Sequence, residues 1–297
     1  MATVLPEADW LAREAAHQQR VHRFTAPHQH RAQRGEPHPV WDFLFTYYSL
    51  RPRQLRRWHP GFGIYLDGPA AGRFATRPGY DRVDGAATVT DTALASRRPT
   101  VSFIAELLSA TADRAPRFNC FGLHEWAMVY RSPEVRHGQV PLRLGAPGTD
   151  AVVDAMPLRC SHFDAFRFFT PAAAELNGEQ LRRDTQLATE QPGCIHAAMD
   201  LYKWAYKLGP LVPSELVMDC LDLAADARAI DMRASPYDLT DYGFAPITIE
   251  TAAGRAEYVK AQQGITERAA PLRAELARRC ELLLTRSTAG SPAVTGG

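Results

Sequence analysis

The sequence predicts an α+β protein that forms a single domain, with a mostly helical C-terminal half and a small β-sheet in the middle. Its 297 residues are 45% hydrophobic and 23% charged, which is ordinary globular composition and enough chain for a sizeable core. Short β-like runs lie before residue 100 and between 140 and 170, whereas helical periodicity dominates after residue 180. No internal repeat and no obvious linker divides the chain.

The N-terminal third is expected to combine a helix with short strands. Residues 6–34 are predominantly polar and helix-like, so 1–37 are predicted to form an exposed helical arm. The main domain is predicted to span 38–284, and it begins with the densest aromatic stretch of the chain, at 38–68. The runs IYLDG and RVDGAATVTD then predict strands, and a short helix is expected over 101–113.

The middle of the chain predicts a strand–helix–strand unit. PLRLG (141–145) is typical of a strand, GTDAVVD begins a helix, and LRCSHFDAFRFF (158–169) alternates as a second strand does. On that second strand His162 and Asp164 share a face with two phenylalanines. Burying polar side chains on such an apolar face is costly unless they are paired or have a functional role. Thr170 and Pro171 are expected to cap and begin the next helix. A short helix is also predicted over 121–131.

The C-terminal half predicts two long helices with polar stripes. On the helix over 193–208, one narrow stripe carries His196, Asp200, Lys203 and Lys207, while the rest is apolar and therefore expected to be buried. The next helix, capped by Ser214, has an acidic stripe made of Glu215, Asp219, Asp222 and Asp226. A short loop predicts antiparallel packing, which would place Lys207 near Glu215 or Asp219, and Lys203 near Asp219 or Asp222.

Three interpretations of these stripes stay open. They are an ion-pair seam or solvated face, an active-site wall in which Asp200 and His196 do chemistry, and a carboxylate–histidine dimetal site. The lysines count against the metal site, because ammonium groups beside a dication cost Coulomb energy. After the stripes, residues 248–250 are expected to close a strand, 252–284 to form one or two helices, and 285–297 to be a disordered tail.

Several classes of protein are excluded by what the sequence lacks. No apolar run approaches 18 residues, so no membrane-spanning helix is expected, and the net charge of +1 gives no overall attraction to nucleic acid. P-loop, dinucleotide-binding and nucleophile-elbow motifs are missing, and Met128 stands where H-E-x-x-H would need its second histidine. There is no secretory signal and no C-x-x-C pair, so a cytoplasmic protein with reduced thiols is expected.

Five segments together resemble an actinobacterial protein family commonly labelled 3-methyladenine DNA glycosylase. The resemblance covers most of the chain up to about Leu276 and is carried by HPVWDFLFTYYSLRPRQLRRWHPG, FGLHEWAMVYR, LRCSHFDAFRFFTP, HAAMDLYKWAYKLGP and DMRASPYDL. It implies a hydrolase that removes alkylated purines from DNA. No catalytic residue is carried over by a motif, so the site residues below are assigned from their own chemistry.

Under the glycosylase hypothesis, a carboxylate stabilises the sugar cation or activates water while aromatic rings hold the extruded base. The catalytic candidates are Asp164, Glu125, His162 and Asp200. Glu125 beside Trp126 is a carboxylate in an aromatic setting, which suits acid–base work. Base stacking is assigned to Trp126, Tyr47 and Tyr48, and contact with DNA phosphates to Arg51, Arg53, Arg56 and Arg57. This hypothesis requires no cofactor.

Two rival hypotheses remain. The main rival is a metal-dependent, non-haem-iron type of enzyme that acts on a small molecule in specialised metabolism. It would bind iron or another divalent metal through His124, His162, His196, Asp200 and Asp222. The other rival is a non-catalytic binding protein. All of the catalytic hypotheses require these side chains, which come from distant segments, to meet in one cleft.

Overall fold

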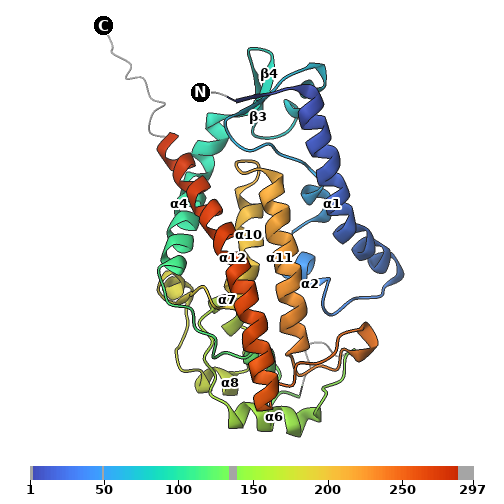
Figure 1. The fold of residues 1–297 in the computed structure, drawn as a ribbon, viewed down its shortest axis with the longest axis vertical. Helices are drawn as coiled ribbons and strands as arrows, with labels where there is room; N and C mark the ends of the chain where they lie inside the picture. The colour runs from blue at the N-terminus through green and yellow to red at the C-terminus, as the bar shows by residue number, and fades with distance from the viewer. Residues whose placement is uncertain (1–2, 49, 134–138, 287–297) are drawn as a thin grey trace.

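Four long helices form the centre of the molecule in the computed structural model, which describes residues 3–48, 50–133 and 139–286. Figure 1 shows these helices side by side, with the sheet at one end of the bundle and several short helices at the other. They are α4 (Asp91–Ala112), α10 (Ile195–Leu208), α11 (Ser214–Arg233) and α12 (Ala252–Arg286). The α+β class and the helical C-terminal half are therefore confirmed.

A four-stranded mixed sheet covers one end of the bundle, and its strands are β1 (Thr3–Leu5), β2 (Ile64–Leu66), β3 (Tyr80–Val83) and β4 (Ala86–Val89). Their order is β1-β2-β4-β3, with β1 parallel to β2 and the other pairs antiparallel. Asp84 and Gly85 join β3 to β4 with positive φ angles of 49° and 87°, as a tight hairpin turn requires. The strands predicted from IYLDG and RVDGAATVTD are confirmed.

The strands predicted over 141–145, 158–169 and 248–250 are wrong. The described part of these segments contains only isolated bridges, Leu142 with Tyr237 and Leu158 with Asn177. The helix expected between the first two is present as α6 (Gly145–Ala155), and it is followed by the single turn α7 (Phe163–Phe166) and by α8 (Pro171–Leu176). Thr170 caps α8 by accepting a hydrogen bond from the Ala173 amide, as predicted. Alternation alone does not make a strand, because a strand needs a partner of matching register.

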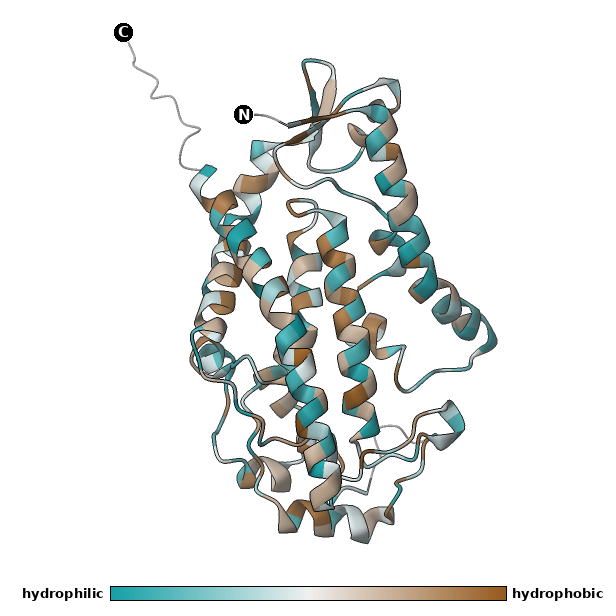
Figure 2. Ribbon diagram, in the orientation of Figure 1, coloured by the Kyte–Doolittle hydropathy of each residue, from teal (hydrophilic) through white to brown (hydrophobic). Residues whose placement is uncertain are grey.

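The first helix, α1 (Glu7–Arg34), packs against α11 and η1 and is not the exposed arm that its composition predicts. Trp10 is fully buried and donates its indole N–H to the carbonyl of Asp67 at 2.9 Å. Other buried residues of α1 follow at helical spacing, and they are Glu14, His17, Val21 and Thr25. The polar composition belongs to its outer face, which Figure 2 shows as hydrophilic along much of the helix.

Short helices connect these parts. They are α2 (Phe43–Thr46), α3 (Pro52–Leu55), η1 (Pro69–Phe74), α5 (Leu123–Ala127), η2 (Arg183–Thr185), α9 (Gln186–Thr189) and η3 (Thr240–Tyr242). The helix predicted over 101–113 begins earlier, at Asp91, where Thr90 caps it. The terminal segment is one helix that continues to Arg286, so 285–286 are helical; the rest of the predicted tail lies outside the described residues.

The main hydrophobic core lies between α1, the sheet and the four central helices, and a second core lies where α5, α6 and α8 meet the first half of α12. Helix α10 is the most enclosed element, since twelve of its fourteen residues are buried. None of the described helices combines the length and the apolar character that crossing a membrane would require.

Candidate functional site

The first three residues of the polar stripe of α10 lie inside the protein, as the apolar surroundings of the stripe predict, whereas Lys207 at its end is exposed. His196, Asp200 and Lys203 are each less than a tenth exposed. Unpaired charges at such positions are costly, so their partners define the candidate site. These partners are not the acidic stripe of α11. Arg20 of α1 binds both Asp219 and Asp222, while Glu215 and Asp226 pair with other arginines. The predicted contacts of Lys203 and Lys207 with that acidic stripe are therefore wrong.

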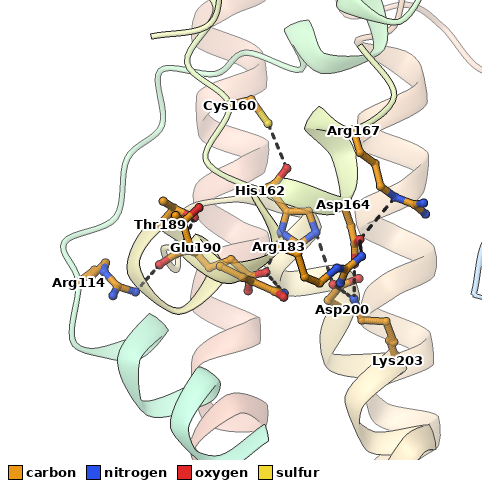
Figure 3. Close-up of polar contacts among 12 residues, drawn as sticks. Arg114, Cys160, His162, Asp164, Arg167, Arg183, Thr189, Glu190, Asp200 and Lys203 are labelled. Atoms are coloured by element: carbon orange, nitrogen blue, oxygen red, sulfur yellow. Dashed lines mark hydrogen bonds and ion pairs between the residues drawn. The ribbon is translucent and has the colours of Figure 1, made fainter. Parts of the chain in front are cut away.

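Lys203 instead joins two carboxylates in a first buried group (Figure 3). Its ammonium lies 3.1 Å from Oδ2 of Asp164 and also binds Asp200, one turn earlier on α10. His162, just before α7, faces Asp200 with Nε2 at 3.4 Å and Glu190 with Nδ1 at 3.2 Å, in both cases without hydrogen-bond geometry. Asp164 also binds Arg183 at 2.7 Å, near the surface. We call His162, Asp164, Asp200 and Lys203 the lysine group.

Opposite charges decide the protonation of the lysine group. Burial by itself lowers the pKa of His162, but the negative charges of Glu190 and Asp200 outweigh it and raise this pKa to about 9. Burial raises the pKa of Asp164 and of Asp200, but Lys203 outweighs it and holds both pKa values below their usual range. The group therefore contains two cations and two carboxylates at neutral pH.

A second buried group surrounds the end of α11. His124 of α5 places Nε2 2.6 Å from Oδ1 of Asp231, and Nη1 of Arg228 donates to the other oxygen of Asp231 at 2.9 Å. The same Nη1 lies 2.7 Å from Oε1 of Glu125. The ring of His196 stands nearly perpendicular to that of His124, with centroids 4.4 Å apart. We call His124, His196 and Asp231 the two-histidine group.

The two histidines of this group carry different charges. Burial lowers the pKa of both rings. At His124 the adjacent Asp231 outweighs burial and raises the pKa well above its usual value, whereas at His196 the positive charge of His124 adds to burial and lowers it further. Asp231 itself has a lowered pKa because His124 outweighs the effect of burial. His196 is therefore a neutral imidazole beside a charged one.

The two groups form one continuous centre, because the rings of His162 and His196 stack at 5.5 Å with an interplanar angle of 18°. The centre is drawn from α5, α7, α10, α11 and the segment between α9 and α10. The catalytic hypotheses require that His124, Glu125, His162, Asp164, His196 and Asp200 meet, and the structure brings all six together. Each of the carboxylates also has a cationic neighbour.

A cavity of about 420 Å³ opens onto this centre. Glu125, Asp164, His196 and Arg228 line it, together with an aromatic wall made by Phe43, Tyr47 and Phe168. The rings of Phe43 and Tyr47 stack in parallel at 4.5 Å, and the guanidinium of Arg228 lies 3.9 Å above Phe43. Tyr47 donates its hydroxyl to the carbonyl of Asp164 at 3.1 Å. This volume suits a small molecule.

Several residues assigned from the sequence lie elsewhere. Trp126 is fully buried in the second core and donates its indole N–H to the Ala234 carbonyl, so it is a packing residue and not a stacking surface. Asp222 binds Arg20 on the outer side of α11 and does not join the histidines. The arginines predicted to contact phosphate, Arg51, Arg53, Arg56 and Arg57, surround α3, and none of them lines this cavity.

Tyr48 lies behind the aromatic wall, not on the cavity surface. It is buried, its ring packs edge-on against Tyr47 at 4.9 Å and against Tyr202 at 5.9 Å, and burial raises its pKa well above the usual value. Stacking of Tyr48 on a ligand, which the sequence predicts, therefore requires the wall to move. Of the two tyrosines, only Tyr47 faces the cavity.

Three residues of the centre are missing from the sequence-based assignment: Arg228, Asp231 and Glu190. Asp231 lies in the last turn of α11, which continues to Arg233. A signal was available, because Cys220, Ala224 and Ala227 form the buried face of that helix and a further four residues lead to Asp231. Glu190 follows α9 and has no periodic neighbour that would indicate burial.

The arrangement contains two candidate sites for a cation. Each buried group offers three ligand atoms that lie within 4.8 Å of one another. In the two-histidine group they belong to His124, His196 and Asp231, and in the lysine group to His162, Asp164 and Asp200. Imidazole and carboxylate together suit zinc, iron and manganese.

In a comparison with known proteins, no family model, no curated protein and no solved structure matches this chain.

Proposed function

We propose that this protein is a metal-dependent enzyme that acts on a small molecule in the cavity beside Tyr47 and His196. The dication would be held by His124, His196 and Asp231. The observation that carries the proposal is the meeting of these three ligand atoms within 4.8 Å in the protein interior, with His196 also lining the cavity. A metal at that position would be reached from the cavity.

The donor set indicates the kind of metal. Two imidazoles and one carboxylate are typical of non-haem iron(II), which keeps open positions for substrate or oxygen. Asp231 is already oriented for such a role, since Arg228 holds the oxygen that does not face His124. Neighbours that fix a ligand in this way are characteristic of metal centres. Glu125, held by the same arginine, would offer a carboxylate to the bound molecule.

The lysine group is the weaker candidate for the metal. Lys203 places its ammonium between Asp164 and Asp200, in the position that a dication bound by those carboxylates would need. Repulsion between an ammonium and a dication opposes binding there. In the two-histidine group Arg228 binds Asp231 and Glu125 but neither imidazole. His124 is itself charged there, and a metal bound to its ring would replace a proton.

Metal analysis tests the proposal. Protein purified without chelator, or reconstituted with iron(II) in the absence of oxygen, is expected to hold about one equivalent of metal. His124→Asn and His196→Asn should lose this metal while retaining the circular dichroism of the fold, and exposed His30→Asn is the matched control. A folded wild-type protein that holds no stoichiometric metal after reconstitution with iron, manganese or zinc would remove the proposal.

Base excision from alkylated DNA is a second candidate function, and one observation favours it. Asp164, whose lowered pKa keeps it ionised, shares the cavity with the parallel rings of Phe43 and Tyr47, which is the combination that an extruded cationic base requires. The test is release of 3-methyladenine from methylated duplex DNA in the presence of EDTA. Release that Asp164→Asn abolishes would support this function over the metal enzyme; absence of release above a boiled control would reject it.

A further inference from the structure

A second cavity, of about 460 Å³, lies at the other end of α10. It is bounded by α1, α3, the start of α4 and the turn between α10 and α11. Lys207, which lines it, follows His196 by eleven residues on the same helix, or about 16 Å along the axis. This cavity is therefore separate from the metal centre proposed above, and no role in that proposal uses it.

The charge of the second cavity is strongly one-sided. Its lining contains four cationic side chains and, among the described residues, no Asp or Glu; the cations are Arg57, Arg77, Arg97 and Lys207. Arg77 has Glu14 behind it at 3.7 Å and donates to the Trp58 carbonyl. In the part of the chain that the structure describes, Arg57 and Lys207 have no carboxylate within ion-pair distance. Such convergence of like charge in a hollow creates a positive potential that attracts anions.

Two histidines add polar groups to the same cavity. His17, only 3% exposed, donates Nε2–H to the Leu55 carbonyl at 2.8 Å, which leaves Nδ1 as an acceptor with no hydrogen-bond partner among the described residues. Nδ1 of His59 lies 2.8 Å from the hydroxyl of Tyr80. The rings of His17 and His59 thus form part of the polar wall of this cavity.

The remainder of the lining is suited to an organic body. Leu50, Leu55 and Val217 contribute apolar surface, and Tyr206 contributes a ring whose hydroxyl is already used by Gln54. Ser214, the first residue of the twenty-residue helix α11, also lines the cavity. The positive end of that helix dipole adds to the field of the four cations.

From these features we infer that the second cavity binds a small phosphate monoester. A phosphate monoester carries up to two negative charges on three acceptor oxygens, which matches several converging arginine and lysine donors. The volume exceeds that of the phosphate, and the apolar lining receives the rest of the molecule. The inference does not depend on the proposed metal, so each can fail without the other.

Calorimetric titration tests this binding in phosphate-free buffer of low ionic strength, with phenyl phosphate, inorganic phosphate and a short DNA duplex as probes. Phenyl phosphate should bind wild-type protein more tightly than inorganic phosphate does. The double variant Arg57→Gln, Lys207→Gln should weaken this binding about tenfold or more, since charged hydrogen bonds are lost. The matched control is Arg53→Gln with Lys260→Gln, two exposed cations outside the cavity, and it should bind like wild type.

Three results would overturn the inference. The first is no measurable binding of phenyl phosphate by the wild-type protein. The second is equal weakening in the cavity variant and the control, which would mean that only the general charge of the surface matters. The third is binding of the duplex alone, lost in the cavity variant, which would assign these cations to a nucleic acid backbone. Both substituted side chains are exposed, so the variants are expected to fold.

Discussion

His124 and Asp231 are 107 positions apart in the sequence, yet Nε2 of one lies 2.6 Å from Oδ1 of the other in the protein interior. The contact exists because the short helix α5 packs beside the last turns of α11. Arg228, one turn before Asp231, holds the second carboxylate oxygen and also Glu125. This histidine–aspartate–arginine arrangement fixes one edge of the cavity and makes the buried centre sensitive to the loss of any one charge.

Arg228→Met should destabilise the metal-free protein strongly, by about 3–5 kcal/mol, because it leaves Glu125 as a buried carboxylate without its cation and removes one of the two cations that bind Asp231. The free energy of unfolding from urea titration at pH 7 measures this. The matched control is Arg268→Met, which breaks an exposed ion pair with Asp226 and should cost less than about 1 kcal/mol. Equal losses in the two variants would contradict the importance of the buried charges.

Trp126→Ala should act on stability and not on ligand binding. The side chain is fully buried and its N–H is used by the Ala234 carbonyl, so its removal should cost about 3–5 kcal/mol. Phe103→Ala, at an aromatic residue that is 38% exposed, is the comparison and should cost much less. Thermal unfolding checks both variants. A small effect of Trp126→Ala would mean that this ring is not part of the core.

His59 should make the protein less stable in acid. Burial, assisted by the charge of Arg77, lowers the pKa of His59 from its ordinary 6.5 to about 3. Because the unfolded chain then binds a proton that the folded protein refuses, stability is intact above pH 6.5 and is lost as the pH falls toward 3. At pH 5 the loss from this residue is at most about 2 kcal/mol.

The measurement is the free energy of unfolding at pH 7 and pH 5 in phosphate-free buffer. His59→Gln should remove this part of the pH dependence, whereas the exposed His30→Gln should retain all of it. If wild type and His59→Gln lose the same free energy between the two pH values, His59 is not held in its neutral form.

Thr90→Ala should weaken the start of α4, one of the four central helices. The hydroxyl of Thr90 accepts a hydrogen bond from the Ala93 amide at 3.1 Å, and losing such a cap costs about 1 kcal/mol. Thr100→Ala, inside the same helix and without a capping role, should cost less or nothing. A lower melting temperature for Thr90→Ala than for Thr100→Ala would support the cap, and the reverse order would argue against it.

The sequence predicted those elements whose signals are local. The strands within IYLDG and RVDGAATVTD, the cap at Thr170 and the buried character of α10 each depend on residues within a few positions of one another. The strand expected over 158–169 failed because alternation describes one chain segment, whereas a strand exists only with a hydrogen-bonded neighbour. Likewise, the sequence assigns Trp126 to base stacking because it is an aromatic ring beside a carboxylate, although burial decides its role.

By itself the sequence determined that the C-terminal half is helical and that His196, Asp200 and Lys203 would share one stripe in apolar surroundings, because helical geometry converts spacing into direction. It also determined that such a stripe must have partners. Which partners it has was decided only by the tertiary structure: Asp164 for Lys203, Asp231 for His124, and Arg20 for the acidic side chains of α11. Charges attract without regard to sequence separation, so only the packing of distant helices selects among the possible pairs.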